Sequence, residues 1–130
     1  MTFGMTNTAI YSPEFKSKLK PLAKKYLTLK ESIRSLEKAL IENPYLGDAY
    51  GDKIYKVRWG DASKGRGKSG GFRVMYYLLN ETKEGTEILF LTIFDKSEAD
   101  TIKKNVAVKL RDLVLEKMGL PVKSRNTPKK

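Results

Sequence analysis

At Asn43-Pro44 the spacing of hydrophobic residues changes from a helical period to an alternating one. Before that point, two segments carry apolar residues at steps of three and four, as one face of an amphipathic helix does. The first segment follows Ser12-Pro13, an N-cap and a proline suited to the first helical position. The second follows Thr28, which is expected to form a capping box with Glu31. The sequence therefore predicts two helices before Asn43-Pro44.

After this point the sequence predicts a small sheet. Alternating patterns mark three strands: Lys53–Trp59, Phe72–Leu79 and Glu87–Phe94. The letters "NETKEG" between the last two indicate a hairpin turn, and "YLGDAYGD" before the first indicates a turn-rich segment. The third strand is mostly apolar, which is typical of a central strand buried on both faces.

Two further elements complete the predicted fold. A short apolar strand at Ala9–Tyr11 precedes the helices, and a last helix ends near Met118 at the stop signal Gly119. The apolar face expected for that helix contains Ile102, Val106, Leu110 and Leu113. The order predicts an α+β fold, in which a small antiparallel β-sheet has two N-terminal helices packed on one face and a C-terminal helix grouped with them.

The length of 130 residues suits one domain. We expect a flexible N-terminus at residues 1–8, a single domain at 9–118 and a basic, disordered tail at 119–130. No signal peptide and no membrane-spanning run is visible, so a cytoplasmic protein without a membrane partner is expected.

The composition limits the available chemistry. The chain has no Cys and no His, so we expect no metal site built from thiolates or imidazoles, no cofactor and no histidine base. Lys and Arg number 26 against 15 Asp and Glu, a net charge of +11. Such an excess indicates a polyanionic or acidic partner.

The segment "KGRGKSGGFRV" raises the question of a phosphate-binding P-loop. The P-loop pattern requires a glycine five residues before Gly67, where this chain has Ala62. A P-loop also opens a helix, whereas an alternating strand pattern follows here. The pattern therefore argues against a nucleotide hydrolase.

The same segment belongs to the most basic part of the chain. From Lys53 to Arg73 there are seven cationic residues and a single acid, Asp61. If the bulky apolar residues of both strands pack on the helices, the opposite parity places four groups together on an open sheet face: Lys56, Arg58, Arg73 and Tyr77. A patch of fixed positive charge is what a phosphodiester backbone requires.

Three motifs follow the two amphipathic helices in a fixed order: "IYKVRWG", "GKSGGFRVMYYLL" and "ILFLTIFDKSEADTI". In this order, over about Ile10 to Leu115, they resemble the RelE/HigB branch of the RelE/ParE toxin superfamily. The resemblance implies a RelE-like fold and the toxin of a bacterial type II toxin–antitoxin system. It further implies a metal-independent endoribonuclease that cuts mRNA in the ribosomal A site.

The resemblance also assigns roles. A lysine-x-basic pair that contacts the scissile phosphate falls on Lys56 and Arg58, and a strand arginine falls on Arg73. A further basic residue past the fourth strand falls on Lys96. Lys56 is then the candidate general base, Lys96 or Tyr77 the candidate general acid, and the RNA-binding residues are Lys53, Lys64, Arg66 and Lys68. The tyrosine that some RelE members carry has no match, because Ile102 stands near its place.

The implied partners are a cognate acidic antitoxin, the ribosome with its mRNA, and operator DNA through the antitoxin. Two alternatives stay open. One is a ParE-like toxin that inhibits DNA gyrase without nuclease activity, because a shared fold does not fix function. The other is a basic binding module without catalysis.

Overall fold

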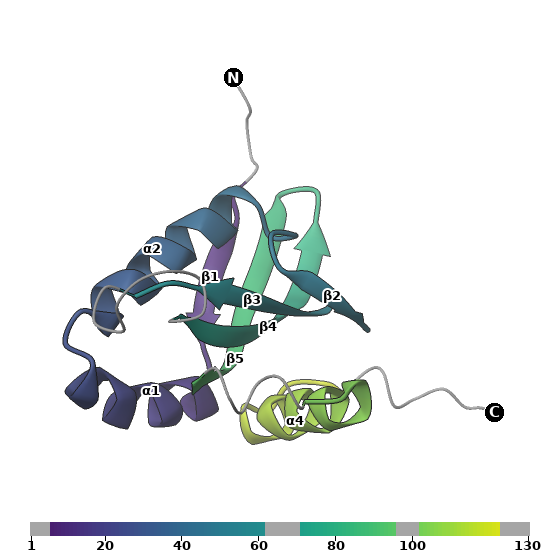
Figure 1. Cartoon of the computed structure of the whole chain (residues 1–130). Coiled ribbons are helices and arrows are strands. Elements are labelled where there is room, and N and C mark those ends of the chain that lie inside the picture. Colours follow the sequence, from purple (N-terminus) through teal and green to yellow (C-terminus); the bar gives the residue numbers. More distant parts are fainter. Residues whose placement is uncertain (1–5, 62–70, 96–101, 123–130) are drawn as a thin grey trace.

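The computed structural model describes residues 6–61, 71–95 and 102–122. A five-stranded sheet has the strand order β1-β5-β4-β3-β2 (Figure 1). The strands are β1 (Thr8–Tyr11), β2 (Asp48–Gly51), β3 (Ile54–Trp59), β4 (Phe72–Thr82) and β5 (Gly85–Asp95). The helices are α1 (Pro13–Lys25), α2 (Leu29–Glu42) and α4 (Lys104–Lys117). The predicted α+β class is confirmed.

The sheet is mixed, which corrects the prediction of a wholly antiparallel one. β1 pairs in parallel with β5, from Thr8 opposite Glu87 to Tyr11 opposite Phe90. The end of β1 is fixed by Ser12, whose N–H donates to the carbonyl of Phe90 and whose hydroxyl donates to that of Leu91, both at 3.2 Å. A four-residue apolar pattern carries no information about strand direction, so only the tertiary contacts reveal it.

β2 lies in the segment predicted to be turn-rich. It pairs antiparallel with β3, with Asp48 opposite Lys56 and Ala49 opposite Tyr55. The chain then reverses through Gly51 and Asp52, whose φ angles are 86° and 54°. Because the strand is short and is followed at once by turn residues, its letters resemble a loop.

α1 and α2 cover one face of the sheet. Ser12 caps α1 as predicted, since its hydroxyl oxygen accepts a hydrogen bond from the Phe15 N–H at 3.0 Å. The predicted capping box of α2 is wrong, because Thr28 makes no cap bond and donates instead to the Asp61 carboxylate at 3.1 Å. The predicted strand parity is confirmed by the core on this face, which includes Phe15, Leu36, Leu40, Val57, Phe72, Val74, Tyr76 and Phe90.

α4 lies against the opposite face, not beside α1 and α2 (Figure 1). Ala107, Val114 and Leu115 pack there in a second core with Ile54, Met75, Tyr77, Leu89 and Leu91. The predicted apolar face of this helix is also wrong, because Val106 and Leu113 are 46% and 55% exposed. The side of the helix that faces the sheet includes Arg111 and Asp112, which are buried and bond to each other. Charged residues therefore lie where apolar ones were expected.

The ends of the predicted domain take part in the fold. The N–H of Thr6 donates to the Glu84 carbonyl at 2.6 Å, and β1 begins at Thr8. α4 ends before Gly119, whose φ of 73° fits the predicted stop. Leu120 packs against the second core. In the described ranges, none of the helices is long and apolar enough to cross a bilayer.

Candidate functional site

The β3–β4 ladder brings three predicted site residues together. Arg58 lies directly opposite Arg73, and Lys56 lies opposite Met75, so all three cations share one sheet face. Residues directly opposite in an antiparallel pair have Cβ atoms about 4.5–5.5 Å apart. The register therefore gathers Lys56, Arg58 and Arg73 toward the end of the ladder where β4 begins. We call these three residues the cationic cluster.

The cationic cluster sets Arg58 directly against Arg73, while Asp48 of β2 lies opposite Lys56. Like charges directly opposite each other destabilise a strand pair, and the Arg73 side chain is only 4% exposed. Within the described residues, no carboxylate lies at ion-pair distance from Lys56 or Arg58. A bound phosphate would offset the repulsion, because a guanidinium matches two phosphate oxygens at once.

Tyr50 of β2 fixes the position of Lys56. The Lys56 ammonium lies 5.4 Å from the centroid of the Tyr50 ring, a cation–π distance. The Tyr50 hydroxyl in turn donates to the Ile102 carbonyl at 3.2 Å, in the segment that enters α4. No sequence pattern indicates this role, since Tyr50 stands among turn residues.

A hollow of about 230 Å³ lies at the edge of β3 beside the cationic cluster. Leu46, Gly47 and Asp48 form one wall, and the side from β3 includes Lys56, Arg58 and Trp59. The hollow exists because β2 pairs with β3 only as far as Lys56. Cations beside an indole ring can hold a nucleotide, with the phosphate on the cations and the base on the ring.

Gly71 sets the start of β4. A Cβ atom at this position would collide with the carbonyl oxygen of Trp59, so only glycine permits the close approach of the two strands. The next residue, Phe72, is held by the Tyr26 ring at 5.2 Å between centroids. Arg73, the second residue of β4, is therefore held opposite Arg58.

Two predicted residues do not lie with the cationic cluster. Tyr77 is 7% exposed and lies under α4, where the Arg111 guanidinium is 5.0 Å from its ring centroid. Lys53 lies beyond the opposite end of β3 and pairs with Glu81 at 2.9 Å, which raises the pKa of Lys53. The other predicted residues, Lys64, Arg66, Lys68 and Lys96, lie outside the described residues.

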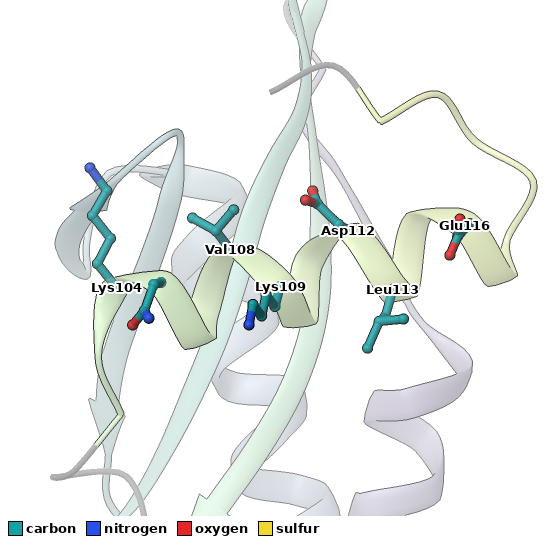
Figure 2. A pocket seen from close by; sticks show the side chains of 7 residues that line it. Lys104, Val108, Lys109, Asp112, Leu113 and Glu116 are labelled. Atoms are coloured by element: carbon teal, nitrogen blue, oxygen red, sulfur yellow. The ribbon is translucent and has the colours of Figure 1, made fainter. Parts of the chain in front are cut away.

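A larger hollow, of about 810 Å³, lies along α4 (Figure 2). One helix alone lines it, with both signs of charge: Lys104, Asn105, Val108, Lys109, Asp112, Leu113 and Glu116. It is an uncovered helix face and holds none of the predicted residues. In the part of the chain that the structure describes, no three carboxylates gather as metal ligands would.

No family model matches the chain. Among solved structures, the chain is similar to the E. coli toxin RelE, in a double arginine-to-alanine mutant in the free state, with a TM-score of 0.50. The two sequences are 16% identical, and the match covers 88% of this chain and 99% of that one. At this identity the likeness concerns the fold. The RelE-like fold that the sequence motifs implied is confirmed.

Proposed function

We propose that this protein is the toxin of a bacterial type II toxin–antitoxin system and that it cuts mRNA in the A site of the ribosome. The observation that carries the proposal is the direct opposition of Arg58 and Arg73 beside Lys56. Two guanidinium groups in register repel each other, and their arrangement suits a phosphodiester. The RelE-like fold and the adjoining hollow with Trp59 add support.

The proposed reaction is an in-line attack of an RNA 2′-hydroxyl oxygen on the adjacent phosphorus. The P–O5′ bond breaks, which leaves a 2′,3′-cyclic phosphate on one product and a 5′-hydroxyl on the other. Lys56 takes the proton of the attacking hydroxyl, and Lys96 supplies a proton to the leaving 5′-oxygen. Arg73, aided by Arg58, binds the non-bridging oxygens as their negative charge increases.

The burial of Tyr77 under α4 favours Lys96 over Tyr77 as the general acid. Lysines are weak acids and bases for this work, so most of the rate acceleration must come from other sources. Fixed cations that face the developing negative charge often contribute most to catalysis. Holding the RNA in line can supply about 7–11 kcal/mol, a task that the ribosome would perform for the toxin.

The proposed function requires partners. At a net charge of +11, the chain needs an acidic antitoxin to cover its cationic surface, and electrostatic attraction makes such association fast. The antitoxin would carry the pair to operator DNA. Ribosomes and mRNA place the activity in the bacterial cytoplasm.

The test is Arg73→Ala, expressed without antitoxin. We expect growth arrest to disappear and mRNA cleavage to fall by about 100-fold or more, as when one stabilising donor is removed from a transition state. Lys83→Ala is the matched control, because Lys83 is exposed in the turn between β4 and β5, at the end of β4 opposite to Arg73. Circular dichroism should show both variants folded.

Either of two results would overturn the proposal. One is an Arg73→Ala protein that is folded and as toxic as the parent. The other is growth arrest with induction of the DNA-damage response and intact mRNA, which would indicate a gyrase inhibitor instead.

A further inference from the structure

A row of lysines runs along α1 on the side of the sheet away from the cationic cluster. Lys16, Lys20 and Lys24 follow one another at steps of four residues, and Lys30 of α2 joins them. Together with Leu19 and Ala23 they line a groove of about 390 Å³. We call this feature the lysine groove. Nothing in the proposed reaction uses it.

The lysine groove lowers the stability of its helix. Like charges four residues apart destabilise a helix by about 0.2–0.5 kcal/mol per pair. Lys16 also lies near the N-terminal end of α1, where the helix dipole disfavours cations. Within the described residues, no carboxylate lies at ion-pair distance from any of the four lysines. Folding alone therefore does not account for the row.

The helices that carry the lysine groove contact the ends of β3 and β4 near Arg58 and Arg73. Tyr26, at the C-terminal end of α1, packs edge-on against Phe72, which directly precedes Arg73. The Lys25 ammonium lies 5.4 Å from the centroid of the Tyr26 ring. On the α2 side, the Thr28 hydroxyl bonds to Asp61, just past the end of β3. The C-terminal end of α1 thus lies next to the ends of β3 and β4 that carry Arg58 and Arg73 on their other face.

We infer that the lysine groove binds the sugar–phosphate backbone of folded RNA that flanks the strand to be cut. At a rise of 1.5 Å per residue, lysines four residues apart are spaced by about 6 Å along α1, so each can meet a different phosphate. Flexible point charges fix a backbone without reading bases. No acidic residue lines the described groove to repel it. This inference deepens the proposed function, because the choice of RNA as the ligand rests on that function.

The test is a triple variant in which Lys16, Lys20 and Lys24 become Gln, a residue of similar helix propensity. Binding is measured by fluorescence anisotropy with two 2′-O-methyl RNAs, which have no free 2′-hydroxyl for attack: a hairpin and a short single strand. For the hairpin, we expect the slope of log affinity against log salt to become shallower by about 2–3, since each lost phosphate contact contributes about 0.7–0.9. Affinity for the short strand should stay unchanged.

The control is a second triple variant in which Lys83, Lys109 and Lys117, all exposed, become Gln. This control removes the same number of positive charges, but outside the lysine groove. Its slope of log affinity against log salt for the hairpin should equal that of the parent protein. The inference is overturned if both triple variants lose the same slope, if the groove variant keeps the parental slope, or if it loses the short strand equally. The inference is also overturned if the groove variant loses binding to phosphatidylserine vesicles and still binds the hairpin as the parent does. That result would indicate that the groove binds a membrane surface instead. None of these readouts uses cleavage, so failure here differs from failure of the proposed nuclease.

Discussion

Arg58 and Arg73 show how a stability cost can mark a functional position. Their backbones are register partners, and their side chains lie on the same sheet face. Cross-strand pairs normally contribute through contact or opposite charge, whereas two guanidinium groups repel each other. Arg73 is moreover buried, where weaker solvent screening makes the repulsion stronger. An anion bound between the two guanidinium groups would offset this repulsion.

The substitution Arg58→Gln should separate stability from activity. Because the repulsion with Arg73 disappears, we expect the free energy of unfolding to stay equal or rise by up to about 1 kcal/mol, and to rise most at low salt. RNA cleavage should fall at the same time. Urea denaturation and cleavage assays measure the two effects.

Arg34→Gln is the control for this prediction, since Arg34 is an exposed arginine on α2. It should neither stabilise the protein nor reduce cleavage. A clear loss of stability in Arg58→Gln would contradict the idea that the pair is repulsive.

Glu81 provides a pH-dependent contact at the far end of β3. Its carboxylate accepts a hydrogen bond from the Tyr45 hydroxyl at 2.6 Å and pairs with Lys53 at 2.9 Å, and both contacts lower the pKa of Glu81 below its usual 4.5. A carboxylate with a lowered pKa stabilises the fold above its unfolded pKa and loses this effect as the pH falls through its folded pKa. The Glu81 contribution should therefore be complete at pH 7 and vanish in acid.

The check compares the parent with Glu81→Gln by urea denaturation from pH 7 to pH 3. Because Lys53 is well exposed, the difference at pH 7 should be at most about 1 kcal/mol. It should begin to shrink below about pH 4.5. A difference that stays constant down to pH 3 would argue against the contact.

At the scale of elements, the buried side chain of Arg111 holds α4 against the sheet. Two nitrogens of Arg111 donate to one Asp112 oxygen at 3.0 and 3.1 Å, and a third donates to the Asp52 carbonyl at 3.0 Å. The guanidinium also covers the Tyr77 ring. These contacts tie the helix to β4 and to the turn before β3.

Arg111→Met should destabilise the protein by about 3–5 kcal/mol, because it leaves the Asp112 carboxylate buried without its cation. Adding Asp112→Leu should restore much of that loss, since an apolar pair of similar size often replaces a buried ion pair without cost. Urea denaturation of both variants measures the effect. If the single variant is as stable as the parent, the pair does not hold α4.

The elements differ in how far the sequence could predict them. Strand parity placed Lys56, Arg58 and Arg73 correctly on one face, since an alternating period translates directly into sheet faces. The position of α4 could not be predicted, because Arg111 and Asp112 neutralise each other inside and leave Leu113 outside. Because α4 packs on this side of the sheet, it covers Tyr77, whose sheet face was predicted to be open. Tyr50 was missed because its contact with Lys56 joins two strands.

At the scale of the whole molecule, the sheet separates two hydrophobic cores, one on each face. α1 and α2 close one face and α4 part of the other, so β4 and β5 are buried on both faces along most of their length. The cationic cluster lies toward the end of the β3–β4 ladder where β4 begins. Lys53, at the other end, is already paired with Glu81. The described lysines and arginines of the surface are therefore not equivalent, because some are paired with carboxylates and others are not.

The salt dependence of RNA binding should reveal this asymmetry. With a short 2′-O-methyl single strand, Arg58→Gln should make the slope of log affinity against log salt shallower by about 0.7, the value for one lost phosphate contact on a single strand. Lys83→Gln removes the same charge from the molecule, yet Lys83 lies in the turn at the far end of β4, so the slope should stay at the parental value. Fluorescence anisotropy over a range of salt concentrations measures both slopes. Equal losses in the two variants would mean that the RNA responds to net charge alone and that the cationic cluster is not its binding site.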